Sequence, residues 1–109
     1  MIRVEALWLS AEPLDMRGGT ETILARVVQV FGAAQPHHAY LFANRRGNRM
    51  KVLVHDGHGI WLAHRRLNQG RFHWRAGVGT VELNRAQFDA LILGLPWEPL
   101  ANGGVIQIL

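Results

Sequence analysis

The chain has 109 residues, of which 49% are hydrophobic and none is cysteine. This length fits one domain, because a second core would leave the first with too little apolar surface to bury. The absence of cysteine excludes a disulfide framework, a thiolate zinc site and a cysteine nucleophile. We therefore predict a single domain over residues 1–109, in which residues 98–109 form a tail or an additional edge strand.

The apolar segments of the sequence are short. The longest runs are far below the roughly 20 residues that a membrane-spanning helix needs. The first ten residues lack the apolar length and the small-residue cleavage site of a signal peptide. These features predict a cytoplasmic protein with no membrane association.

Positive charge is concentrated in one part of the chain. The formal net charge is +4, yet residues 44–75 hold eight Arg or Lys residues and a single acid, Asp56. Seven of these eight cations are arginine, whose planar guanidinium binds phosphate in a bidentate manner. The composition therefore fits a polyanion-binding surface. It fits a merely solvated basic surface equally well.

The first half of the chain predicts a strand, a helix and a second strand. Residues 4–9 read as a short strand, and Asp15 is a suitable N-cap for a helix that begins at Met16 and ends before Gly32. Apolar or small residues recur there at helical spacing. Two glycines, Gly18 and Gly19, would then lie in the first turns. Residues 39–43 read as the next strand.

The middle of the chain predicts an antiparallel meander. Residues 49–55 and 58–66 alternate between polar and apolar around Asp56-Gly57, a dipeptide favoured in type I′ hairpin turns. A four-residue loop would leave the two faces unchanged, whereas an odd loop length would exchange them. Residues 71–75 are expected to add a third strand.

The last third predicts a strand, a capped helix and an apolar end. Residues 80–83 read as a strand, and Asn84 with Gln87 forms the pattern of a capping box before a helix. Residues 105–109 resemble an edge strand through which two copies could associate. The predicted fold class is α+β: a small antiparallel sheet, made of the central meander and one or two further strands, packed with two helices.

The alternation sorts the meander into two faces. Met50, Val52, Val54 and Trp61 fall on a core face, whereas most basic side chains fall on the opposite face. In the simplest register Arg66 lies across from Arg71, and like charges in that position are destabilising without a counter-ion. We expect DNA phosphate to supply it. The candidate DNA-binding residues are Arg45, Arg46, Arg49, Lys51, His64, Arg66, Arg71, His73 and Arg75.

Other chemistry is weakly supported by the sequence. The hairpin histidines raise the question of a metal site, but zinc needs three or four ligands and only Asp56 could assist them. The eight acids are scattered, and none forms a pair suited to acid–base or two-metal catalysis. We therefore predict no enzyme activity, no metal site and no cofactor.

Several motifs along the chain form one set. They are Asp15-Met16-Arg17-x-Gly19, Leu41-Phe42, Asn44-Arg45-Arg46-Gly47, Lys51-Val52-Leu53, Asp56-Gly57-x-Gly59 and Arg66-Leu67-x-x-Gly70-Arg71-Phe72-x-Trp74. This set resembles one known family, the TnpB accessory proteins of insertion sequence sixty-six (IS66-type) transposons, and the similarity runs from about Leu7 to Trp97. Nothing here resembles the unrelated RNA-guided nucleases that share the TnpB name.

The resemblance implies a small bacterial, nucleoid-associated protein that is encoded beside a separate transposase and is needed for efficient transposition. It implies no catalytic activity. Our first hypothesis is that the basic sheet face contacts element DNA. The alternative is a protein adaptor that docks on the transposase or on another element protein without touching DNA. A metal-dependent nuclease is the third possibility.

Overall fold

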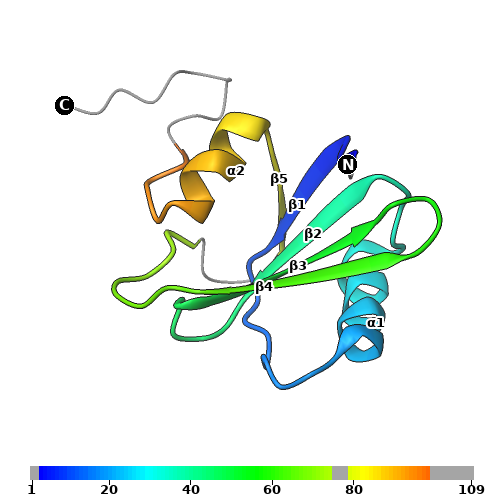
Figure 1. Ribbon diagram of the computed structural model, residues 1–109, viewed down its shortest axis with the longest axis horizontal. Coiled ribbons are helices and arrows are strands. Elements are labelled where there is room, and N and C mark those ends of the chain that lie inside the picture. Colours follow the sequence, from blue (N-terminus) through cyan, green and yellow to red (C-terminus); the bar gives the residue numbers. More distant parts are fainter. Residues whose placement is uncertain (1–2, 75–78, 99–109) are drawn as a thin grey trace.

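The computed structural model describes residues 3–74 and 79–98 as an α+β fold, which confirms the predicted class (Figure 1). The elements in chain order are β1 (Ala6–Ser10), α1 (Thr20–Phe31), β2 (His38–Ala43), β3 (Arg49–His55), β4 (Ile60–Arg66), β5 (Thr80–Leu83) and α2 (Arg85–Ile92).

The strands form one five-stranded sheet in the order β4-β3-β2-β1-β5. β1 and β2 are parallel neighbours, and α1 makes the crossover between them. The other three pairs are antiparallel. A parallel pair needs such a crossover, because the chain must return to the same end of the sheet before the next strand begins. The sheet is therefore mixed rather than purely antiparallel.

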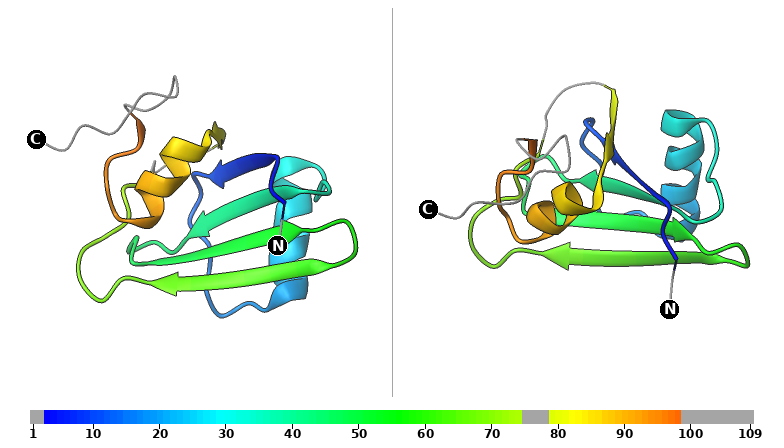
Figure 2. Two further views of the ribbon diagram at one scale, coloured as in Figure 1. Left: turned by 45° about the horizontal axis from the view of Figure 1, so that its top comes forward. Right: turned by 90° about the horizontal axis from the view of Figure 1, so that it is seen from above.

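Each face of the sheet is covered by one helix (Figure 2). On one face Tyr40, Phe42 and Leu53 pack with Ile23 and Val27 of α1, and all five side chains are almost fully buried. On the other face the apolar residues of β1, β2 and β3 pack around α2 and Trp97. The strands next to the centre are therefore apolar on both sides, as expected for a sheet between two helical layers.

The predicted basic face is largely covered by a helix, and the predicted core face is not wholly buried. Trp61, which was predicted to lie on the core face, is 55% exposed. The side chains of alternate residues sort as predicted, but α1 covers much of the face on which the cations were placed. Leu53 is fully buried there, and Ile60 and Leu62 pack against the α1 cluster. The basic residues are consequently confined to one end of this face.

The β3–β4 hairpin is confirmed, with a four-residue turn in place of the type I′ turn. His55 pairs with Ile60, and the N–H of Asp56 bonds to the carbonyl of Gly59 at 3.1 Å. The Asp56 carboxylate accepts hydrogen bonds from the N–H groups of His58 and Gly59 and from the indole of Trp61. This carboxylate therefore organises the turn.

These three hydrogen bonds predict an unusual titration of Asp56. They lower the pKa of its carboxyl from 3.8 to about 2. The charged form is favoured in the folded chain, so its stabilising contribution is complete above pH 3.8 and is lost as the pH falls toward 2. A carbon-13 NMR titration should give a midpoint near 2, and Asp56→Ala should remove this part of the acid sensitivity. A midpoint near 3.8 would contradict the described turn.

The predicted third strand of the meander is wrong. Residues 71–74 form no strand, and Arg66 pairs with Arg49 rather than with Arg71. His64 likewise lies across from Lys51 and not from His73. The N–H of Phe72 bonds to the carbonyl of Gly47, so the chain turns back over the β2–β3 loop. The antiparallel meander is instead β2-β3-β4.

The two helices differ in how well their starts were predicted. The α1 helix begins at Thr20 with Gly19 as its N-cap, so the predicted start at Met16 with Asp15 as N-cap is wrong. In α2 the predicted capping box is confirmed: the side chain of Asn84 accepts from the N–H of Gln87, and the Gln87 side chain accepts from the N–H of Asn84.

Two predictions fall on residues outside the described ranges. These are the apolar strand at residues 105–109 and the position of Arg75. Within residues 3–74 and 79–98, neither helix has the length and apolar character needed to cross a membrane.

Candidate nucleic-acid interface

The β2–β3 turn presents two arginines on a firmly bonded loop. The side-chain oxygen of Asn44 accepts from the N–H groups of Asn48 and Arg49, each at 3.1 Å. The Asn44 amide donates to the Asn48 side-chain oxygen at 2.7 Å. Gly47 has a φ of +72°, a conformation that favours glycine. Arg45 and Arg46 occupy the exposed tip of this turn.

A second segment, residues 13–19, is tied to the sheet beside this turn. The N–H of Leu14 bonds to the carbonyl of Ala43 at 2.8 Å. The ammonium of Lys51 donates to the carbonyls of Met16 and Gly18, both at 2.7 Å, and the lysine is only 7% exposed. Both carbonyls can accept these bonds because they are not engaged in the hydrogen bonds of a helix. These bonds explain why α1 begins later than the sequence suggested.

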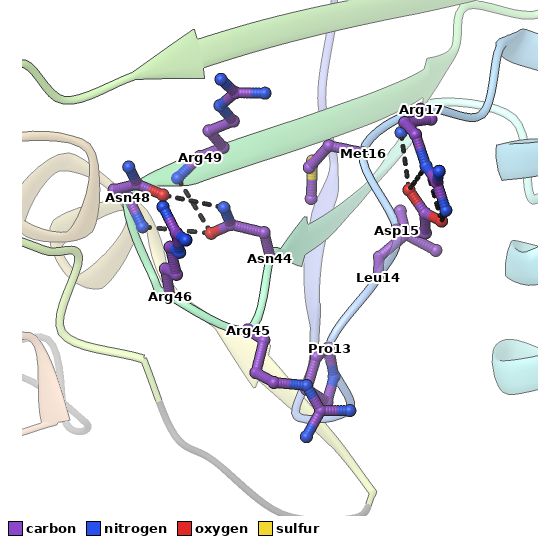
Figure 3. Close-up of a pocket in the computed structure, with 10 residues that line it drawn as sticks. All are labelled: Pro13, Leu14, Asp15, Met16, Arg17, Asn44, Arg45, Arg46, Asn48 and Arg49. Atoms are coloured by element: carbon purple, nitrogen blue, oxygen red, sulfur yellow. Dashed lines mark hydrogen bonds and ion pairs between the residues drawn. The ribbon is translucent and has the colours of Figure 1, made fainter.

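The turn and the segment face each other across a hollow of about 760 Å³. Figure 3 shows Arg45 extending toward Pro13, with Met16 between the two walls. The hollow is lined by Pro13, Leu14, Asp15, Met16, Arg17, Asn44, Arg45, Arg46, Asn48 and Arg49. We call it the arginine groove.

The single acid of the arginine groove is already paired. Arg17 contacts both carboxylate oxygens of Asp15, with a shortest distance of 2.7 Å. These hydrogen bonds, above all the one to the arginine side chain, lower the pKa of Asp15 to about 2. Asp15 is therefore ionised at neutral pH and neutralised by its own neighbour. Arg45, Arg46 and Arg49 remain as uncompensated charges along the groove.

Further cations lie on β3 and β4 next to the groove. Arg49 is directly opposite Arg66 in the antiparallel ladder, and Lys51 is opposite His64. The pKa of His64 is lowered, first by partial burial and then by the positive charges of Lys51, Arg49 and Arg66. His64 is therefore neutral at pH 7 and can donate a hydrogen bond without adding to the repulsion.

The basic segment forms no ion pairs within the described residues. Four ion pairs occur there, and their cations are Arg3, Arg17, Arg26 and Arg85, all outside residues 44–75. The cations of residues 44–74 therefore meet no described carboxylate at ion-pair distance. The one acid of that segment, Asp56, bonds to its own turn and to Trp61.

Most of the predicted binding residues converge, but not all. Arg45, Arg46 and Arg49 line the groove, while His64 and Arg66 lie beside it. The prediction of Lys51 as a binding residue is wrong, because its ammonium is buried and donates to the carbonyls of Met16 and Gly18. Arg71 is exposed on the loop that bonds back to Gly47 through Phe72.

One predicted residue lies away from the groove, and one residue of the groove was not predicted. His73 lies apart, because its carbonyl accepts from the Trp97 indole and it lines a separate hollow with Trp74 and Pro96. Arg17 was missed as a site residue. It is part of the Asp15-Met16-Arg17 motif, so the motif was the available signal.

Within the described residues, no three His, Asp or Glu side chains are placed to hold a metal ion together. His37 and His38 do lie at the same end of the sheet as the β3–β4 turn. The indole of Trp8 donates to Nδ1 of His38, and Gly57 lies against the His37 ring. These histidines therefore serve in packing.

A comparison with protein-family models identifies the chain over most of its length. Residues 5–102 match the model described as IS66 Orf2 like protein. The chain belongs to the IS66 Orf2-like family. This finding confirms the resemblance carried by the motifs, and it makes the chain an Orf2-like accessory protein of transposition.

Two curated relatives of this IS66 Orf2-like protein come from Sinorhizobium fredii. The uncharacterized protein y4hO is 32% identical over 94 residues, which cover 84% of this chain and 82% of the relative. The uncharacterized protein y4jC is 26% identical over 94 residues, which cover 84% and 80%. No solved structure matches the IS66 Orf2-like chain significantly.

Proposed function

We propose that this accessory protein binds the DNA of its insertion sequence through the arginine groove, mainly by contacting backbone phosphates. The observation that carries this proposal is the set of uncompensated cations around the groove. Four carboxylates of the described residues pair with arginines outside residues 44–75, whereas the arginines of the turn and of the β3–β4 ladder pair with no described acid. Arginine guanidinium groups bind phosphate through bidentate, charge-assisted hydrogen bonds.

The geometry of the groove suits a backbone more than a base edge. Arg45 and Arg46 project from a short turn rather than from a helix that could enter the major groove. Arg49 and Arg66 form a pair of adjacent cations on a sheet surface. Phosphate contacts of this kind fix position but carry little sequence information. We therefore expect similar affinity for terminal-repeat and for random duplexes.

Removing the two arginines at the tip of the turn tests this proposal. Arg45→Ala with Arg46→Ala should weaken duplex binding at least tenfold in a fluorescence-anisotropy titration, because each lost phosphate contact also loses released counter-ions. The matched control is Arg3→Ala with Arg85→Ala, which removes the same charge from two arginines outside the groove. Equal losses in both double variants would show that only net charge matters.

An acidic protein segment is the alternative ligand for the same groove. Carboxylates also form bidentate pairs with arginine, so the transposase or another element protein could dock there. The two functions separate cleanly. If the isolated protein does not bind DNA even at about 50 mM salt but co-purifies with the transposase, the adaptor function replaces the DNA-binding function.

A further inference from the structure

The outer edge of β4 is open in the described part of the molecule. Among the described strands, β4 is the last of the sheet and pairs with β3 on one side only (Figure 2). The ladder is framed by the bonds from Asp56 N to Gly59 O and from Leu67 N to Asn48 O. In an antiparallel ladder the bonding residues alternate. The N–H and C=O groups of Ile60, Leu62, His64 and Arg66 therefore point outward.

One face of β4 is also uncovered. Trp61, Ala63 and Arg65 are exposed on the α2 side of the sheet, and Trp61 is 55% exposed. The Trp61 indole is held by its hydrogen bond to Asp56 at 2.7 Å. An exposed tryptophan that is already fixed in one position loses little conformational entropy on binding. Tryptophans of this kind are common anchors of protein interfaces.

We propose that β4 pairs with β4 of a second copy of this chain, antiparallel and about a two-fold axis at Ala63. The strand has an apolar half, Ile60 to Leu62, and a basic half, His64 to Arg66. The two-fold axis places each apolar half opposite a basic half. Trp61 then faces Arg65 of the second copy, which is a cation–π arrangement.

The backbone selects the same register. With the axis at Ala63, Ile60 meets Arg66 of the second copy and Leu62 meets His64, so all four outward-facing residues find a partner. If the register shifts by two residues, so that the axis falls at His64, the His64 residues of the two copies face each other. One outward-facing residue of each β4 strand then has no partner. In this register the arginines of the two copies do not face each other, because Arg65 meets Trp61 and Arg66 meets Ile60.

The dimer is independent of the proposed DNA contact but has a consequence for it. A two-fold axis perpendicular to the sheet keeps the α1 side of both copies on the same side of the joined sheet. Both arginine grooves then face the same way, and one duplex could contact both. If the chain proves to be monomeric, a single copy can still bind DNA. If the chain does not bind DNA, the dimer can still form.

A single cysteine at the axis tests the register directly. The chain has no cysteine, so Ala63→Cys introduces the sole thiol. Ala63 would sit in a non-hydrogen-bonded pair with its own copy, at a Cα distance of about 4.5 Å that a disulfide can bridge. Mild oxidation should cross-link this variant at least tenfold faster than Ala25→Cys, which places a thiol on the exposed side of α1. Equal rates would overturn the proposal.

The second test is the dissociation constant of the dimer, measured by sedimentation. Trp61→Ala should weaken the dimer at least tenfold, because the substitution removes one indole from each copy and therefore two from the interface. The control Leu93→Ala removes an equally exposed apolar side chain from the end of α2 and should leave the dimer unchanged. Circular dichroism verifies that both variants are folded. A monomeric wild-type chain, or a dimer that ignores Trp61→Ala, would overturn the proposal.

Discussion

Replacing Lys51 with methionine should lower the free energy of unfolding by about 2–4 kcal/mol, since hydrogen bonds to a charged group contribute about 1.5–3 kcal/mol each. The ammonium makes two such bonds, and methionine leaves both carbonyls without a donor. Relief of the buried charge offsets part of the loss. Chemical denaturation measures the change.

The same variant should also weaken DNA binding, although Lys51 is buried and does not reach the ligand. Its bonds hold residues 16 and 18 against β3, and this segment forms one wall of the arginine groove. Arg49→Met, two residues earlier on the same face of β3, is the control for stability. Its side chain is partly exposed and makes no described ion pair, so the fold should lose little. Equal destabilisation in the two variants would contradict the assigned role of Lys51.

Replacing Arg66 with alanine should change stability and DNA affinity in opposite directions. Arg66 lies directly across from Arg49, and like charges at such positions are destabilising. The variant should therefore unfold at a slightly higher denaturant concentration than the wild type. It should bind duplex DNA about tenfold more weakly, because a phosphate contact is lost.

Arg65→Ala is the matched control for this prediction, with both variants titrated at protein concentrations at which the chain is monomeric. Arg65 is the preceding residue on β4, carries the same charge and points to the opposite face of the sheet. Its removal should reduce DNA affinity much less than the removal of Arg66. If the two variants lose affinity equally, the bound DNA does not distinguish the faces of β4, and the arginine groove is not the binding site.

Short-range patterns predicted much of the fold because their causes are local. The capping box of α2 needs only Asn84 and Gln87, which are three residues apart. The alternation of side chains between the two faces of the β3–β4 hairpin was predicted correctly. The observed four-residue turn is longer than the expected turn by two residues, and an even difference does not exchange the faces. The five strands also follow from alternation and turn residues.

The errors arose where distant contacts decide the structure. Lys51 holds the carbonyls of Met16 and Gly18, and a residue more than thirty positions away gives no local signal for the start of α1. Residues 71–74 alternate like a strand, yet Phe72 bonds to Gly47 and fills the core beside α2. The alternation there reflects burial of single aromatic side chains and not pairing in the sheet.

The predicted cations of the candidate site do not share one sheet face, because α1 covers much of the face on which they were placed. Leu53, Ile60 and Leu62 already lay among the cations in the sequence, and they mark the area that α1 covers. The position of a crossover helix depends on the parallel pairing of β1 with β2, which the sequence did not predict. The cations left uncovered at the end of the face, together with Arg17, make the groove.

The most direct test of the central claim is the salt dependence of duplex binding by the wild-type protein. If the arginine groove contacts about three to five phosphates, the logarithm of the binding constant should fall linearly with the logarithm of salt concentration, with a slope of about −2.7 to −4.5. Terminal-repeat and random duplexes should give the same slope. Absence of binding at about 50 mM salt, or an affinity that does not change with salt, would contradict DNA binding through the groove.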